Sequence, residues 1–438
     1  MSEILIAGAG IGGLSAAIAL GGRASNRNHR ITIAEKSSKI SEVGAGIQLG
    51  PNATQILIRW GLQAELKELA YEPDQLHVKS ALSGVELASM RLGVKFREQY
   101  GAPYLTLHRA DLHSILYAHV IKHEIAEIAL SHELEYFEET KEGVNVNFCD
   151  NSEATQKISL GQNRQISYDA VIGADGVWSR VRHLLNEALI KTAPIQKSSS
   201  KLVTNVEFSG DLAYRSLISQ KSLPSQLRLN SVRVWLGPHM HLVQYPVKGG
   251  EWLNSVLFVD SRKIQNHGHY SLSKSNLLSW DVPLDQNQLG LFFQDILQKC
   301  CSELRDSILA LGSWRAWPIM KSEPLITHLQ MAQGSVALLG DAAHPMLPYL
   351  AQGAGMAIED ANALGIQYKT NPNLGANINL SNYSKSRWQR NAMVQKRALL
   401  NQKVFHADRA LAVARNTSLK LLGEKLLNMP WLYGYIQM

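Results

Sequence analysis

A glycine-rich motif close to the N-terminus constrains the fold of this chain more than any other feature. Residues 8–13 read GAGIGG and fit the pattern G-x-G-x-x-G. An apolar stretch at 4–7 precedes the motif and a stretch of small and apolar residues at 14–20 follows it, which predicts a strand, a tight turn and a helix. Together with the β-branched stretch at 31–34, these residues predict a βαβ unit of the usual length, about 30 residues.

The glycines of this motif, with one acidic residue, predict a dinucleotide site. Gly8 permits the sharp turn, Gly10 lets the backbone approach a pyrophosphate, and Gly13 lets the helix lie close to the strand. The helix N-terminus adds N–H groups and a positive dipole. Glu35 ends the second strand 22 residues after Gly13, where its carboxylate can accept hydrogen bonds from ribose hydroxyls and would repel a 2′-phosphate. This pattern leaves both FAD and NAD open.

The composition indicates a globular chain in a reducing compartment. Of the residues, 45% are hydrophobic and 18% are charged, which is typical of a globular chain. The length of 438 residues allows two to three domains. The 3 cysteines include the adjacent Cys300 and Cys301 and are too few for a disulfide framework. The apolar run at 4–20 is interrupted by glycines and lacks a preceding positive residue, so it predicts neither a signal peptide nor a membrane span. We therefore expect a cytoplasmic protein.

Positive charge is concentrated near the C-terminus. The net charge is +7, and ten Lys or Arg residues lie between Lys385 and Lys425 against two acidic residues. We interpret this segment as a solvated helix face, with attraction of acidic lipid or of a small anionic substrate as alternatives. No nucleic-acid-binding motif accompanies the charge, so we exclude nucleic acid as a partner.

The middle of the chain has the pattern of an antiparallel sheet, and the last part is helical. Four stretches read as strands, with Gly-Pro and Gly-Gly pairs between the later ones: 201–208, 231–236, 241–247 and 253–259. A further strand is expected at 336–339, followed by a helix at 356–364 and by helices after Ser381. The predicted fold is an α/β nucleotide-binding domain that is interrupted by a mostly antiparallel β domain and followed by C-terminal helices.

Two later clusters favour FAD over NAD. Residues 168–182 (YDAVIGADGVWSRVR) and 336–345 (VALLGDAAHP) are each a strand that runs into a polar turn. Asp341, at the end of the second strand, is placed to accept hydrogen bonds from a polyhydroxyl chain. Residues 353–355 would present backbone N–H groups at a helix start to a developing negative charge. An NAD dehydrogenase has no use for a ribityl-binding aspartate so far along the chain.

Taken together, these motifs resemble those of a known family, the single-component FAD-dependent aromatic hydroxylases, and within it the salicylate-hydroxylase-like group. The motifs that carry the resemblance are the glycine motif with Glu35, residues 43–49 (VGAGIQL), residues 107–112 (LHRADL), the turns Asp175-Gly176 and Gly340-Asp341, and residues 431–434 (WLYG). The resemblance implies a Rossmann-like FAD-binding domain, a substrate-binding β domain and a C-terminal helical part. Their expected ranges are 1–76, 105–183 and 325–375 for the first, 77–104 and 184–324 for the second, and 376–438 for the third.

The resemblance also implies roles for individual residues toward the cofactor. Glu35 would hold the adenosine ribose, Arg109 would reach the pyrophosphate or the flavin side, and Asp341 would bind the ribityl chain or a phosphate. For Asp175 the alternative is a turn-capping carboxylate, and for Arg109 it is a surface arginine. The full set expected to contact FAD is Gly8, Gly10, Gly13, Glu35, Lys36, Gly46, Ile47, Gln48, Arg109, Asp175, Asp341, Gly353, Ala354 and Gly355.

The chemistry of such a family follows from its cofactor. NADH or NADPH binds transiently and reduces the flavin, O2 then forms a C4a-hydroperoxide, and the distal oxygen passes to an electron-rich ring. The protein must exclude water, fix the acidic group of the substrate and help to deprotonate a phenol. We therefore expect tightly bound FAD, no metal, a small aromatic acid as substrate, and a monomer or homodimer. Hydroxylation with loss of CO2 is a variant for a substrate whose hydroxyl and carboxylate are ortho.

Four residues are candidates for the substrate side of the reaction. Arg215 could anchor a carboxylate, Tyr245 could hydrogen-bond a phenolate, His241 could shuttle its proton, and Tyr349 could close the pocket. His241 and Tyr245 share one face of their predicted strand. Each of the four could instead have a purely structural role in the core or between domains.

Departures from the family pattern leave the substrate open. The chain reads Ile319-Met320-Lys321-Ser322 where many relatives carry an Asp-Arg pair, and Gln244 stands where relatives often have His. A larger or N-heterocyclic ring, such as a hydroxynicotinate, a polyketide or a quinone precursor, is therefore an alternative. A flavin-dependent halogenase is disfavoured because residues 314–319 do not have the Trp-x-Trp-x-Ile-Pro spacing. A non-catalytic flavin-binding protein is the alternative from another class.

Overall fold

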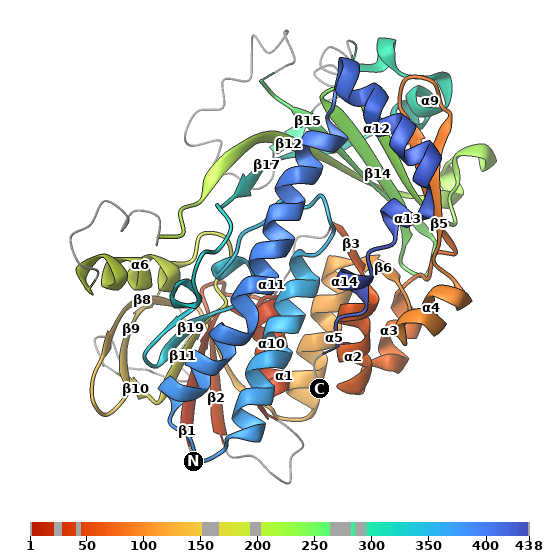
Figure 1. The fold of residues 1–438 in the computed structure, drawn as a ribbon. Helices are drawn as coiled ribbons and strands as arrows, with labels where there is room; N and C mark the ends of the chain where they lie inside the picture. The colour runs from red at the N-terminus through yellow and green to blue at the C-terminus, as the bar shows by residue number, and fades with distance from the viewer. Residues whose placement is uncertain are drawn as a thin grey trace.

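Two large sheets organise the part of the chain that the computed structural model describes, namely residues 2–21, 29–40, 45–150, 166–192, 203–262, 282–284, 294 and 296–436. One sheet is mainly parallel and the other mainly antiparallel, and long helices from the last part of the chain run beside both (Figure 1). The mixed α/β fold that the sequence predicted is confirmed.

The mainly parallel sheet contains the N-terminal βαβ unit. Its strand order is β18 (Ala332–Gln333), β19 (Val336–Leu338), β11 (Ala170–Gly173), β1 (Ser2–Ala7), β2 (His29–Glu35) and β7 (Glu127–Leu130). Leu5 of β1 lies opposite Thr32 and Val171 in parallel register. Consecutive β1 residues 4–6 are completely buried because elements cover both faces of such a sheet, which explains why the stretch is apolar without alternation.

The mainly antiparallel sheet is built largely from the middle of the chain. Its strand order is β16 (Val282–Leu284), β17 (Trp314–Lys321), β12 (Glu207–Ser219), β15 (Trp252–Asp260), β14 (Met240–Val247), β13 (Val232–Gly237), β4 (Gln75–Ser80) and β5 (Glu86–Arg91). All neighbours are antiparallel except β13 and β4.

One strand prediction in this sheet was wrong. We expected a strand at 201–208, but residues 203–206 are not in a strand, β12 begins at Glu207, and 201–202 lie outside the described residues. Gly210 lies inside β12 with φ +90° at a register shift between Phe208 and Leu212. A glycine that usually marks a strand end is here a β-bulge in a longer strand.

Two small sheets and the helices complete the fold. The small sheets are β10 (Ile166–Tyr168) with β9 (Val144–Asp150) and β8 (His132–Glu139), and β3 (Gly46–Leu49) with β6 (Leu105–His108). The α-helices are α1 (Ile11–Gly21), α2 (Pro51–Arg59), α3 (Gln63–Leu69), α4 (Val94–Tyr100), α5 (Arg109–Lys122), α6 (Arg180–Thr192), α9 (Ser302–Ala310), α10 (Gly353–Thr370), α11 (Ala376–Phe405), α12 (Arg409–Leu422), α13 (Glu424–Leu427) and α14 (Pro430–Tyr433). Helix α10 packs against α1, and α11 packs against α10 (Figure 1). A search of the described helices found none with the length and apolar character needed to span a membrane.

The basic C-terminal segment is not simply a solvated face, which corrects our interpretation. Arg387, Arg390 and Arg415 are 0%, 7% and 7% exposed. Arg387 and Arg390 of α11 pair with Glu359 of α10, and Arg415 of α12 donates hydrogen bonds to the last backbone carbonyls of α11. Part of the positive charge therefore holds the C-terminal helices in place.

Candidate functional site

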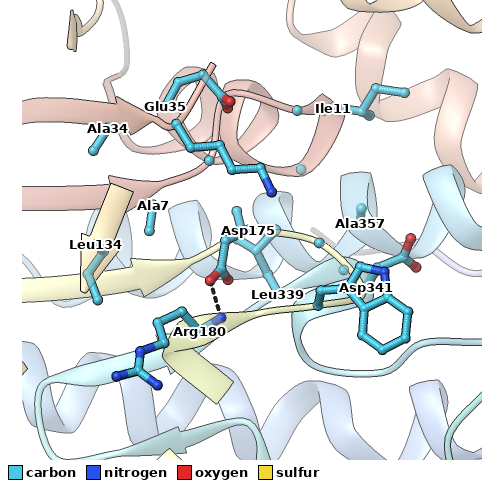
Figure 2. Close-up of a pocket in the computed structure, with 18 of the residues that line it drawn as sticks. Ala7, Ile11, Ala34, Glu35, Leu134, Asp175, Arg180, Leu339, Asp341 and Ala357 are labelled. Atoms are coloured by element: carbon cyan, nitrogen blue, oxygen red, sulfur yellow. Dashed lines mark hydrogen bonds between the residues drawn. The ribbon is translucent and has the colours of Figure 1, made fainter. Parts of the chain in front are cut away.

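A cavity of about 260 Å³ lies at the carboxyl ends of the parallel strands (Figure 2). Its walls come from several segments that are far apart in the sequence. The lining residues predicted from the sequence are Gly8, Gly10, Glu35, Lys36, Arg109, Asp175, Asp341, Gly353 and Ala354. The structure thus brings nine of the expected cofactor residues around one space, at the position where α/β sheets usually bind ligands.

The glycine motif forms the floor of this cavity, and two of its glycines have no room for a side chain. Gly8 has φ +103°, and a Cβ there would lie 2.5 Å from the carbonyl oxygen of Ala174. A Cβ on Gly13 would lie 1.9 Å from the carbonyl oxygen of Gly8. Gly13 does not line the cavity; its lack of a side chain lets α1 pack closely against the turn after β1.

Glu35 lies at the rim of the cavity and fixes the loops around it. Its carboxylate accepts hydrogen bonds from the backbone N–H groups of Ala9, at 2.8 Å, and Ser37, at 2.9 Å. A carboxylate offers about four acceptor positions. Glu35 can therefore keep both backbone contacts and still accept a hydrogen bond from a ribose hydroxyl.

Asp175 lines the cavity, but its carboxylate caps a helix. It accepts hydrogen bonds from the Ser179 hydroxyl at 2.5 Å and from the backbone N–H groups of Arg180 at 2.7 Å and Val181 at 3.2 Å, at the start of α6 (Figure 2). Burial raises the pKa of Asp175, and these hydrogen bonds oppose the rise. The geometry matches the capping alternative, which leaves the backbone of the turn to face a ligand.

Asp341 is held in place by residues that sequence reasoning did not single out. Asp341 belongs to a short 3-10 helix, residues 340–342, and it lines the cavity. Buried Arg182 donates Nη1 hydrogen bonds to the backbone carbonyls of Asp341, at 3.1 Å, and Ala342, at 2.9 Å. Asp360 of α10 accepts from the N–H of Gly340 at 3.1 Å. Arg182 belongs to the motif at residues 168–182 around Asp175. That motif was therefore the sequence signal that could have identified Arg182 as a residue of the site.

The donor set around the cavity fits FAD. Lys36, Arg109 and Arg180 bring positive charge, and the start of α1 adds backbone N–H groups, which suits a pyrophosphate. Glu35 and Asp341 offer acceptors in separate segments of the wall, as a molecule with a ribose at one end and a ribityl chain beyond the pyrophosphate requires. The residues present therefore fit the dinucleotide that the sequence predicted.

Three more of the expected cofactor residues lie on β3, and Gln48 belongs to a second cavity. The N–H of Gly46 donates to Asn254 at 2.8 Å, and a Cβ on Gly46 would lie 2.7 Å from the ring of Tyr245. Gln48 accepts a hydrogen bond from the hydroxyl of Tyr104 at 2.7 Å. Gly46, Ile47 and also Gly355 are outside the lining of both cavities.

The second cavity, of about 440 Å³, lies between the antiparallel sheet and the C-terminal helices. Strands β4, β5, β13 and β14 contribute mainly aliphatic side chains, and α11 to α14 form the opposite wall. The polar residues of the lining are Gln48, Tyr104, His241, Tyr349, Arg397, Asn401, Arg415, Ser418 and Tyr433. Residues 348–351 line this cavity and 353–354 line the first, so a single short segment separates the two.

The structure separates the four substrate-side candidates into two pairs. His241 and Tyr349 line the second cavity, with ring centroids 4.9 Å apart. Tyr245 and Arg215 lie outside its lining and belong to a neighbouring region: Arg215 stacks over Trp317, with its guanidinium carbon 4.7 Å from the ring centroid. The C-terminal wall was not predicted, because no sequence signal links α11 and α12 to the strands they face.

The second pair is electrostatically coupled. Burial is the main cause that lowers the pKa of Arg215 to about 10; Tyr245 opposes this change and Arg109 adds to it. Burial raises the pKa of Tyr245, and Arg215 and a hydrogen bond with Gln48 counteract this rise. The Nε of Arg215 is enclosed and meets no hydrogen-bond partner within the described residues.

Comparison with known proteins agrees with this geometry. A family model described as "FAD binding domain" matches residues 1–222 and 318–398. The chain is 32% identical to 3-hydroxybenzoate 6-hydroxylase 1 of Aquipseudomonas alcaligenes over 99% of this chain and 98% of the relative. It is 31% identical to 6-hydroxynicotinate 3-monooxygenase of Bordetella bronchiseptica, over 83% and 81%. A solved salicylate hydroxylase substrate complex has the same fold, with a TM-score of 0.75 at 23% identity over 99% of this chain and 96% of that chain. The chain belongs to the FAD-dependent aromatic hydroxylases and is an oxidoreductase.

Proposed function

We propose that this enzyme hydroxylates a small phenolic aromatic acid, with FAD as bound cofactor and NAD(P)H and O2 as co-substrates. The observation that carries the proposal is the segment 348–354, which lines both the dinucleotide cavity and the second cavity. A flavin ring at the start of α10 would therefore face a substrate held against β14. When bound, FAD supplies the activated oxygen, and the protein supplies the surroundings of the ring that receives it.

The residues of the second cavity support roles in binding and proton transfer. Its aliphatic walls exclude water from the reacting ring, which protects a reactive oxygen donor from hydrolysis. His241 can accept the phenol proton, and Tyr349 orients one side of the ring. Arg215 lies outside the lining of the second cavity, but its enclosed Nε meets no hydrogen-bond partner within the described residues. This makes Arg215 the candidate for the substrate carboxylate, with Tyr245 beside it. A charge-assisted pair of this kind fixes the acid with directional hydrogen bonds.

A larger substrate is the second candidate, and the size of the cavity favours it. Sites that enclose drug-sized ligands measure roughly 300–1,000 Å³. The second cavity, at about 440 Å³, lies within this range and exceeds what one small ring fills. The relative from Bordetella bronchiseptica is named for an N-heterocyclic acid, which also belongs to this wider group.

We also propose the domain division 1–76, 105–183 and 325–375 for FAD, 77–104 and 184–324 for substrate, and 376–438 for the C-terminal helices. The strands of the parallel sheet fall in the first set and those of the antiparallel sheet in the second, apart from the first residues of β4. Helix α6 spans the boundary at 183. Placement in the cytoplasm, where NAD(P)H is available, is supported by the cysteine content, because 3 cysteines are too few for a disulfide framework.

The test is a substrate panel on purified enzyme. We expect a yellow protein whose NAD(P)H oxidation is stimulated by 3-hydroxybenzoate, salicylate or a hydroxynicotinate, with hydroxylated product that matches the NAD(P)H consumed. A bicyclic phenol and an alkyl-substituted hydroxybenzoate distinguish the larger-substrate candidate. Stimulated oxidation that yields only hydrogen peroxide for every compound would contradict hydroxylation of these classes, and a protein that cannot retain FAD would contradict the proposal as a whole.

A further inference from the structure

Two buried histidines from distant parts of the chain are in direct contact beside the second cavity. His241 of β14 lines the cavity and is 1% exposed. Its Nδ1 lies 2.9 Å from Nε2 of His406, the residue that caps the C-terminus of α11. The ring of His241 stacks on Phe258, with a centroid distance of 4.5 Å and an interplanar angle of 6°. This stacking fixes the imidazole plane. Because Nδ1 of His241 contacts His406, Nε2 is the ring nitrogen of His241 that remains for a ligand in the cavity.

A buried carboxylate continues this contact away from the cavity. Asp211 of β12 is completely buried, and its Oδ1 lies 3.7 Å from Nδ1 of His406. This Oδ1 has no hydrogen-bond partner within the described residues. The other oxygen, Oδ2, accepts hydrogen bonds from the Tyr349 hydroxyl and from Nε2 of Gln402, the latter at 2.5 Å. The 3.7 Å separation is longer than a hydrogen bond, so a rotation of the His406 ring would have to close it before the three groups form a continuous line.

The far end of this line lies near the protein surface. Asp260 and Arg262 form an ion pair of 2.8 Å next to Asp211, and the Arg262 side chain is 63% exposed. His239 also faces His406 and pairs with Asp408 at 3.4 Å. The titratable and charged groups that face the line are therefore Tyr349, His239, Asp260, Arg262 and Arg415.

The electrostatics of the three groups suit proton passage. Burial lowers the pKa of His241 well below its ordinary value, and it lowers the pKa of His406 to about 4 despite the opposing charge of Asp260. Both rings are therefore neutral near pH 7, and each has one N–H donor and one acceptor nitrogen. Burial raises the pKa of Asp211, so its carboxylate accepts a proton more readily than an exposed one. A proton can thus pass from His241 through His406 to Asp211 while neither imidazole ring stays protonated on both nitrogens.

We propose that His406 and Asp211 act as positioning residues behind His241 and carry the phenol proton of the substrate from the cavity toward the surface. This inference rests on the proposed hydroxylase function. The phenol O–H bond breaks and its proton joins Nε2 of His241. The proton on Nδ1 of His241 passes to Nε2 of His406, and the proton on Nδ1 of His406 passes to Oδ1 of Asp211. The substrate becomes a phenolate, Asp211 becomes neutral, and no electrons change hands.

The cycle closes when the proton returns or leaves. Protonation of the product phenolate by the reverse transfers restores the original tautomers of both histidines. Asp211 is completely buried, so exchange of its proton with solvent requires opening of the neighbouring Asp260–Arg262 ion pair, whose arginine is 63% exposed. The line therefore gives the phenol proton a path through the protein that does not depend on water inside the cavity.

The test compares His406→Gln and Asp211→Asn with a control, His183→Gln, which changes an exposed histidine of α6. Each holoenzyme is assayed for hydroxylation of 3-hydroxybenzoate, or of the best phenolic acid found, between pH 6 and 9. FAD content and thermal unfolding report on folding, and a pH-indicator dye in weak buffer reports proton release when the acid binds to the oxidised enzyme. We expect kcat at pH 7 to fall about tenfold or more in both variants. KM should change little, and the deficit should shrink toward pH 9, where phenol ionises more readily in solution.

The outcomes separate this inference from the proposed function. If wild-type enzyme retains FAD but hydroxylates no phenol, the proposed function fails and the proton route fails with it. If wild-type enzyme hydroxylates a phenol and both variants keep the pH profile and proton release of His183→Gln, the route alone is overturned. Should His406→Gln fold poorly, Asp211→Asn together with proton release by the wild-type enzyme decides the question.

Discussion

Arg387 of α11 and Glu359 of α10 form an ion pair in which both side chains are completely buried, with 2.8 Å between Nη1 and Oε2. The same arginine contacts Asp360 at 2.8 Å, and Asp360 accepts a 2.6 Å hydrogen bond from His344. Asn52 of α2 donates to Glu359 at 2.7 Å and to Gln352, the residue before α10, at 3.0 Å. A connected set of buried charges thus supports the helix whose first turn faces the dinucleotide cavity.

The first prediction concerns this ion pair. Arg387→Met should lower the free energy of unfolding by roughly 3–5 kcal/mol, because it leaves buried carboxylates with too few cations. Lys396→Met, an exposed position on the same helix, is the control and should have little effect. Urea unfolding of both variants measures the difference, and an equal loss in the two would contradict a structural role for the buried pair.

The second prediction concerns Asp341 at the wall of the dinucleotide cavity. Asp341→Ala should yield protein with little FAD, because the exposed carboxylate is the acceptor expected for the ribityl chain or its neighbouring groups. The absorbance ratio of flavin to protein after purification gives the result. Asp306→Ala, an exposed aspartate on α9, serves as the control. Full FAD content in Asp341→Ala would remove this side chain from the cofactor site.

The third prediction concerns Arg215. Arg215→Ala should raise KM for the best aromatic acid by about tenfold or more, because a hydrogen-bonded charge contributes roughly 1.5–3 kcal/mol. Steady-state kinetics with the acid and with its uncharged amide form the measurement. The KM for the amide should rise much less, because the amide brings no negative charge to Arg215. An unchanged KM for the acid would assign Arg215 to packing against Trp317 alone.

Much of the fold could be predicted because its signals are local. The turn at Gly8 and the strand before it lie within one short stretch, so spacing and periodicity identify the βαβ unit directly. The strand predicted to end at 208, which continues to Ser219, shows the limit of that approach. A glycine in a strand reads as a boundary, and only the partner strand β17 reveals that Gly210 sits in a bulge.

The parts of the site that could not be predicted depend on pairings across the chain. His241 and His406 are 165 residues apart, and Arg387 lies 28 residues after Glu359 in a helix with no clear apolar face. A buried arginine and a solvated one look the same in a sequence. The carboxylates that pair with a buried arginine such as Arg387 are identified only from the packing of α11 against α10.

The last prediction follows from the lowered pKa of His406. Folding lowers this pKa from its ordinary value of 6.5 to about 4, so between these pH values the unfolded chain binds more protons than the folded one. The stability contributed by neutral His406 is therefore complete above pH 6.5 and is lost as pH falls toward 4, an effect on the order of 3 kcal/mol for a shift of this size. His406→Gln cannot take up this proton, so its free energy of unfolding should fall less steeply between pH 6.5 and 5 than that of the wild type. Urea unfolding at several pH values measures the slopes, with His183→Gln, an exposed histidine on α6, as the control that keeps the wild-type slope. Equal slopes in the wild type and His406→Gln would show that this ring does not resist protonation in the folded protein.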